Sequence, residues 1–171
     1  DTDRSRGLGD VYKRQAYHRV MECLNYSKAG STEDIKNEID RMVREEKLSL
    51  KQAECIKLKD IDTFAGSSIG ERIKRAYAYG GVKREQPFVF EYDRQLVQGV
   101  IDLYFIEDGQ LVIVDYKTDR VLRGRAGEDE LRRRYSIQLD YYAMALSQIT
   151  GLKVKEKVIY SFALGRSLTV E

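Results

Sequence analysis

The sequence has few of the residues that would indicate a bound cofactor or a membrane anchor. Its 171 residues include two cysteines and one histidine. Two cysteines cannot supply the four thiolates that an iron–sulfur cluster requires. Cys23 and Cys55 form no Cys-x-x-Cys pair, so we expect free thiols in a reducing compartment. No apolar run reaches the ~20 residues needed to span a bilayer, so we expect no membrane association.

The charge balance gives no global signal for nucleic acid. Net charge is +2, with 34% charged and 42% hydrophobic residues, as in an ordinary soluble protein. Any affinity for DNA must therefore come from local patches. The length suits one domain, which we place at residues 16–171. Residues 1–15 show no hydrophobic periodicity, and we expect them to be a non-native or disordered leader.

One stretch, residues 97–120, concentrates the chemistry. Residues 100–106 and 111–117 read as two strands, and Asp108-Gly109 between them is a strong hairpin signal. A two- or four-residue loop places Asp102 directly opposite Asp115, whereas a three-residue loop with a bulge would break this register. Because side chains alternate along a strand, Lys117 points to the same face as Asp115.

Two carboxylates facing each other across a sheet repel, so something must offset their charge. A divalent cation does this well, because hard cations take carboxylate oxygens. The alternative is a salt bridge from Lys117 to one aspartate, with the other at a solvated edge. Both strands are apolar on both faces, which is typical of a covered, central position. Burial of unpaired acids there is unfavourable, and this favours a metal site that includes Asp102 and Asp115.

Four motifs in this sequence resemble those of a known nuclease family. GVIDL at residues 99–103 and DYKTDR at residues 115–120 resemble the two halves of the PD-(D/E)xK nuclease signature. YHRVMECL at residues 17–24 resembles the histidine helix of the AddA- and RecB-type nuclease domains, and QLDYYAMAL at residues 138–146 resembles their QxxxY helix. The motifs occur in family order, and as a set they are far more specific than Asp-x-Lys alone.

The resemblance implies roles for residues that local pattern alone leaves undecided. His18 would complete the shell of a Mg²⁺ or Mn²⁺ ion, with the backbone carbonyl of Tyr116 as a further ligand. Lys117 would orient the attacking water, act as a base, or stabilise charge at the phosphate. Gln138 and Tyr142 would face the site and position DNA or the lysine. The alternative for this last pair is a hydrogen-bonded core glutamine with a tyrosine that only packs.

The implied activity is metal-dependent hydrolysis of DNA, exonuclease-type on ends or single strands, in recombinational double-strand break repair in the bacterial cytoplasm. Family members carry an ATP-driven helicase, but no GxxxxGK[ST] loop occurs here. The expected partners are therefore a helicase portion and an AddB-like protein, and ATP dependence is expected only with the helicase. The alternative is a weak or inactive DNA-binding module of the same fold.

The remaining pattern predicts the fold. Helices are expected at residues 32–46, 50–59, 69–79 and 128–150, with further strands at residues 82–92 and 153–162 and a short tail from residue 165. Pro87, the only proline, favours an edge strand or a bulge. Glu85 nearby fits a position close to the metal and an exposed position equally well. This order matches the αβββαβ core of restriction-endonuclease-like folds, a three-layer α/β/α arrangement with a mixed sheet.

Overall fold

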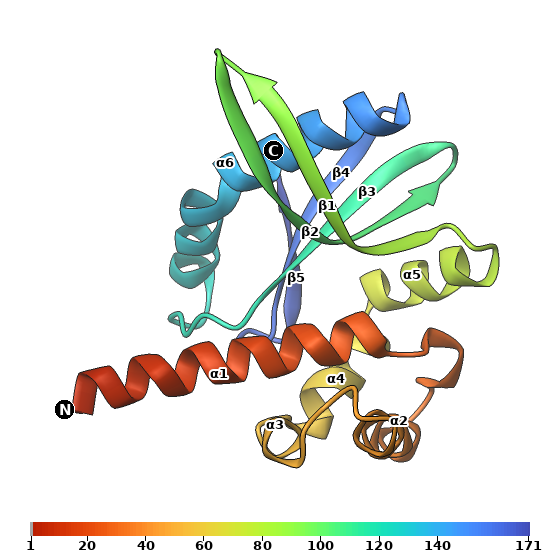
Figure 1. Cartoon of the computed structure of the whole chain (residues 1–171), viewed down its shortest axis with the longest axis vertical. Coiled ribbons are helices and arrows are strands. Elements are labelled where there is room, and N and C mark those ends of the chain that lie inside the picture. The colour runs from red at the N-terminus through yellow and green to blue at the C-terminus, as the bar shows by residue number, and fades with distance from the viewer. Residues whose placement is uncertain (1) are drawn as a thin grey trace. The chain divides into compact units, whose positions relative to one another are not determined.

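The computed structural model describes residues 2–171, and their side chains from Arg4 onward. The chain divides into two compact units, Asp1–Lys74 and Arg75–Glu171 (Figure 1). The expected single domain of residues 16–171 spans both units, and its extent remains a prediction. No helix within residues 2–171 is long and apolar enough to cross a membrane.

The first unit is helical. Its elements are α1 (Thr2–Cys23), the 3₁₀ helix η1 (Tyr26–Lys28), α2 (Thr32–Arg44), α3 (Leu50–Glu54), α4 (Leu58–Ala65) and the first part of α5 (Ser68–Ala78). The Ser31 side chain accepts a hydrogen bond from Asp34 N and caps α2, and Ser49 forms a capping box with Gln52 at α3. The helix expected at residues 50–59 is in fact two short helices, because the chain leaves helical geometry between Cys55 and Leu58.

Helix α1 includes most of the expected leader. Residues 2–15 continue the helix that ends at Cys23, while Asp1 lies outside the described residues. Once a helix has formed, adding residues to it needs no new nucleus, so the stretch can be helical without an apolar stripe. The Leu8 and Val11 side chains are accordingly exposed. That the leader is non-native remains a prediction.

The second unit is built on a five-stranded mixed sheet. Its strands follow the order β1-β2-β3-β4-β5, in which only β3 and β4 pair in parallel. Their bounds are β1 (Val82–Tyr92), β2 (Gln95–Glu107), β3 (Gln110–Lys117), β4 (Val154–Ser161) and β5 (Arg166–Val170). This confirms the predicted α/β class, with Pro87 on an edge strand as expected. Most of the expected short tail from residue 165 is a strand, because β5 pairs with β4.

The β2–β3 hairpin has the predicted register. Asp108 and Gly109 form a two-residue loop, and both have positive φ, 53° and 72°. This is the geometry of the type I′ turn, whose twist matches that of the flanking strands. Tyr104 pairs with Ile113 and Glu107 with Gln110. The hairpin therefore delivers residues 102 and 115 to opposed positions on adjacent strands.

Helix α6 (Arg125–Thr150) connects the parallel strands β3 and β4 and packs on the sheet (Figure 1). It ends as predicted at Gly151, whose φ of 71° is a left-handed conformation that glycine adopts without strain. The helix buries apolar side chains, among them Leu131, Leu139 and Leu146, against strand residues such as Ile113 and Ile159. This packing sets which residues of α6 face the strand ends.

Candidate active site

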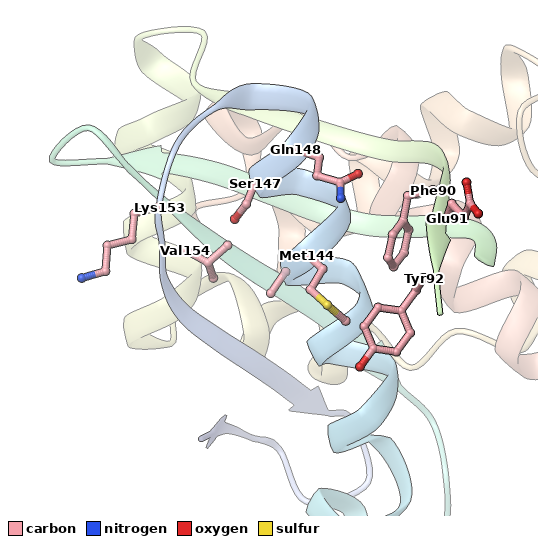
Figure 2. A pocket seen from close by; sticks show the side chains of 9 residues that line it. Phe90, Glu91, Tyr92, Met144, Ser147, Gln148, Lys153 and Val154 are labelled. Carbon is pink, nitrogen blue, oxygen red and sulfur yellow. The ribbon is translucent and has the colours of Figure 1, made fainter. Parts of the chain in front are cut away.

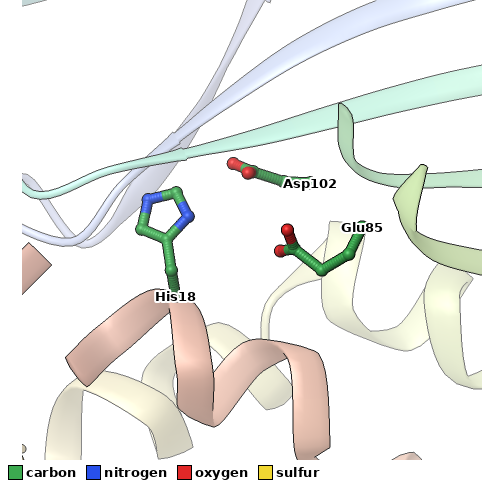
Figure 3. Close-up of side chains that lie close together, drawn as sticks. All are labelled: His18, Glu85 and Asp102. Atoms are coloured by element: carbon green, nitrogen blue, oxygen red, sulfur yellow. The ribbon is translucent and has the colours of Figure 1, made fainter. Parts of the chain in front are cut away.

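Three neighbouring strands each place one acidic residue in a single row. Arg84 pairs with Leu103 and Gln86 with Ile101, so Glu85 on β1 falls opposite Asp102 on β2. Strand β3 lies on the other side of β2. Leu103 pairs with Val114 in this antiparallel ladder, so the next position places Asp102 opposite Asp115. One carboxylate oxygen of Glu85 lies within 4.8 Å of one of Asp102. Figure 3 shows these two side chains near each other. We call Glu85, Asp102 and Asp115 the acid row.

Glu85 was left out of the site expected from the sequence, and the structure places it beside Asp102. Its φ is 49°, an uncommon conformation for a residue other than glycine, and it interrupts the β1–β2 ladder. Such observed departures from standard backbone geometry cluster at functional sites. Sequence reasoning missed this placement because it depends on the Asp93-Arg94 turn between β1 and β2. It has positive φ at both positions without a glycine, so the β1–β2 register could not be read from it.

Asp102 is fixed by the backbone of the neighbouring strand. Its Oδ2 accepts a hydrogen bond of 2.9 Å from the Tyr116 N–H, and the carboxylate is buried. A charge-assisted bond of this kind is stronger than one between neutral groups. The Tyr116 ring is itself buried and packs against Phe162. The site thus has a carboxylate whose orientation depends on the strand pairing rather than on a flexible surface contact.

Asp115 is an acid of the row with a perturbed pKa. Burial raises the pKa of its carboxyl to about 7, the neighbouring Asp102 adds to the rise, and Lys117 opposes it. Its side chain is almost fully buried, so solvent does little to screen these charges. The row therefore holds more negative charge than its surroundings stabilise. This is the situation predicted from the two opposed strands.

Lys117 lies within this cluster and is also buried. Its Nζ is 2.8 Å from Asp115 Oδ2 and donates a 3.1 Å hydrogen bond to Gln138 Oε1 on α6. The salt bridge that was weighed against a metal site is therefore present, but it leaves Asp102 and Glu85 as further acids beside it. Asp102 and Asp115 are both buried, so neither lies at the solvated edge that the alternative required.

Tyr142 and His18 are the other side chains expected at the site. The Tyr142 ring is buried one helical turn beyond Gln138 and packs edge-on against Phe88, with centroids 5.5 Å apart. This geometry matches packing, the alternative weighed for Tyr142. His18 lies half-buried on α1 in the first unit. Its place in a metal shell, like that of the Tyr116 carbonyl, remains a prediction.

The chemistry of the acid row fits a divalent cation. Carboxylate oxygens are the ligands that Mg²⁺ takes from proteins, and Mn²⁺ accepts the same set. The raised pKa of Asp115 shows that its negative charge is poorly compensated by Lys117 alone. A cation would offset the repulsion between Asp102 and Asp115 directly. Glu85, Asp102 and Asp115 are thus the residues of the second unit that could hold one.

A separate hollow of about 480 Å³ lies between β1 and the end of α6 (Figure 2). Its charged lining residues are Glu91 and Lys153, and the rest are apolar or neutral, including Phe90, Tyr92 and Met144. This lining offers no cluster of carboxylates or imidazoles that could hold a metal. The hollow therefore differs from the acid row in lacking a set of metal-binding side chains.

Comparison with known proteins gives the class of protein. A family model described as the PD-(D/E)XK nuclease superfamily matches residues 14–168, and the chain belongs to this superfamily. The mixed sheet is consistent with its restriction-endonuclease-like α/β fold, as predicted. Asp102 and Asp115-x-Lys117 are the residues expected to match the pattern in the superfamily name, and the structure places Lys117 beside Asp115 and Asp102 on the adjacent strand.

Curated relatives narrow the comparison. The chain is 39% identical over 97% of its length to the A component of the ATP-dependent helicase/nuclease of Thermoanaerobacter sp., and 37% identical over 97% to the protein of that name from Acetivibrio thermocellus. The protein of the same name from Clostridium novyi is 34% identical over 94% of the chain. The chain spans 14% of the length of each of these relatives.

Proposed function

We propose that this chain hydrolyses phosphodiester bonds of DNA at the acid row, using Mg²⁺ or Mn²⁺. The observation that carries the proposal is the convergence of Asp102, Asp115 and Lys117 in a buried cluster within a nuclease fold. A bound divalent ion supplies Lewis acidity toward the scissile phosphate and lowers the pKa of coordinated water. Asp102, Asp115 and Glu85 would hold that ion, and the family resemblance implies His18 and the Tyr116 carbonyl as further ligands.

Lys117 is the residue of the chain that acts on the reacting phosphate. Its ammonium forms an ion pair with Asp115 and donates a hydrogen bond to Gln138 on α6, so the position of its positive charge is restricted. A preoriented charge stabilises the negative charge that develops on the phosphate more effectively than water, which must reorganise. The Gln138 contact gives this residue a positioning role toward Lys117, as the family resemblance implies.

The wider role follows the relatives. We propose that the chain acts as the nuclease part of an ATP-dependent helicase–nuclease in the bacterial cytoplasm. There it cuts ends or single strands as an exonuclease during recombinational repair of double-strand breaks, together with an AddB-like protein. The relatives' names support the part played in a helicase/nuclease. Cys23 and Cys55 are thiols rather than a disulfide, which fits a reducing compartment. ATP dependence belongs to the helicase, so we expect cleavage by this chain alone to be slow and poorly processive.

The experiment compares cleavage of end-labelled single- and double-stranded DNA by the wild-type chain and Lys117→Ala, with Mg²⁺, Mn²⁺ or EDTA. Lys155→Ala is the matched control, because Lys155 pairs with Glu107 and Asp108 at the turn end of the hairpin. We expect metal-dependent cutting by the wild type and Lys155→Ala, and a loss of at least ~100-fold in Lys117→Ala. DNA binding without any cutting by the wild type would instead support the inactive module.

A further inference from the structure

We propose that Tyr135 is a positioning residue for Lys117 and that it acts through the face of its aromatic ring. The inference rests on the proposed nuclease function, because it assigns a further residue to the same site. Tyr135 lies on α6, three residues before Gln138, and belongs to none of the motifs that indicate the family. Its side chain is half-buried beside the core.

The Lys117 ammonium lies 3.9 Å from the centroid of the Tyr135 ring. An ammonium has three N–H donors and no acceptor. Asp115 and Gln138 account for two directions of interaction, and the ring face provides a third. Cations are attracted to the negative face of an aromatic ring, and more strongly when both groups are shielded from water. The ring therefore restricts where the end of a long, flexible side chain can lie.

The ring is itself held in place from its outer end. The Tyr135 hydroxyl donates a 2.6 Å hydrogen bond to Asp119 Oδ2, and Arg134 Nη1 donates one of 2.7 Å to the same oxygen. Burial raises the pKa of Tyr135 to about 12, so the hydroxyl remains a donor at neutral pH. A phenol that donates to a carboxylate carries more electron density in its ring, which favours the contact with Lys117.

Helix α6 contacts the Lys117 ammonium through two of its side chains. Gln138 and Tyr135 are neighbours at helical spacing, so α6 contacts the ammonium with both an amide oxygen and a ring face. Small misplacement of a catalytic group lowers rate strongly, even when binding is unaffected. Loss of the ring is therefore expected to lower kcat while leaving KM for DNA nearly unchanged.

The contact is tested first without reference to activity. Protons held above a ring are shifted upfield in NMR, so the Hε signals of Lys117 report on Tyr135 directly. We expect the upfield shift in the wild-type chain and in Tyr135→Phe, which keeps the ring, and its loss in Tyr135→Leu. The signal is assigned by its absence in Lys117→Arg. A Lys117 signal that is identical in the wild type, Tyr135→Phe and Tyr135→Leu overturns the contact.

The role is tested by kinetics of metal-dependent DNA cleavage. We expect Tyr135→Leu to lower kcat by ~10-fold with KM within ~2-fold, and Tyr135→Phe to stay within ~3-fold of wild type. Tyr141→Leu is the matched control, since Tyr141 is half-buried on the same helix and packs against Phe90 and Tyr92. It should cleave at the wild-type rate.

The outcomes separate this inference from the proposed function. If the wild type cleaves and Lys117→Ala does not, an unchanged kcat in Tyr135→Leu overturns the positioning role alone. Equal losses in Tyr135→Leu and Tyr141→Leu also overturn it, because the effect would then be general to the helix. If the wild type cuts no DNA, the proposed function fails and the catalytic role of Tyr135 fails with it. The NMR shift still decides whether the ring holds Lys117.

Discussion

The raised pKa of Asp115 predicts an unusual pH dependence of stability for the metal-free protein. In the folded chain, burial and the adjacent Asp102 raise this pKa from 3.8 to about 7. An acid whose folded-state pKa lies above its unfolded value binds its proton more tightly when folded. Stability from this group is therefore present below the unfolded pKa and is lost as the pH rises through about 7.

The size of the effect follows from the two pKa values. Between pH 5 and pH 8, the shift corresponds to a loss of about 2 to 3 kcal/mol in the free energy of unfolding. Because Asp115 is almost fully buried, screening by solvent reduces this little. The assay is urea unfolding in EDTA at pH 5, 6, 7 and 8, followed by circular dichroism, for the wild type and Asp115→Asn.

We expect the wild type to lose this stability relative to Asp115→Asn as the pH rises, since contributions from other titrating groups cancel in the difference. Adding Mg²⁺ or Mn²⁺ should restore stability to the wild type at pH 8, because a bound cation favours the ionised carboxylate. Parallel pH profiles for the two proteins would refute the reasoning, because they would show that Asp115 ionises in the folded chain at its ordinary pKa.

Three further predictions concern stability. Gly127→Ala should lower the free energy of unfolding, measured by urea titration, by about 2 to 4 kcal/mol. A Cβ at this position would lie 1.7 Å from the Leu122 carbonyl oxygen. A free energy of unfolding near that of the wild type would contradict this. Gly109→Val should lower it by about 1 to 2 kcal/mol, since a branched side chain is strained at the φ of 72° in the hairpin turn; an unchanged melting temperature would contradict this. Glu38→Ala should destabilise the chain by about 2 to 4 kcal/mol, because it removes the buried partner of Arg41, and Glu33→Ala on the same helix should have little effect.

The sequence was sufficient for the centre of the fold. Asp108-Gly109 defined the β2–β3 turn, and the turn defined the register that opposes Asp102 to Asp115. Local turn chemistry and strand alternation carry that information within about 20 residues. The family resemblance implied that Gln138 faces the site, and in the structure its amide oxygen accepts a hydrogen bond from Lys117.

Three features could not be predicted from the sequence, because they depend on contacts between distant segments or on an irregular turn. Glu85 joins the acid row only through the β1–β2 register, which follows from a turn without glycine. The contact of Tyr135 with Lys117 depends on how α6 crosses the sheet, which helical periodicity alone does not determine. Strand β5 carries weak local signals and is ordered by pairing with β4.

The central claim is that the acid row binds a divalent cation, and Mn²⁺ binding followed by electron paramagnetic resonance tests it most directly. The variants are Asp102→Asn and Glu85→Gln, with Glu91→Gln as the control, because Glu91 is an exposed acid on the same strand as Glu85. We predict that the wild type and Glu91→Gln bind Mn²⁺ alike, and that Asp102→Asn and Glu85→Gln bind at least ~10-fold more weakly. Equal Mn²⁺ affinity in all four proteins would contradict the account.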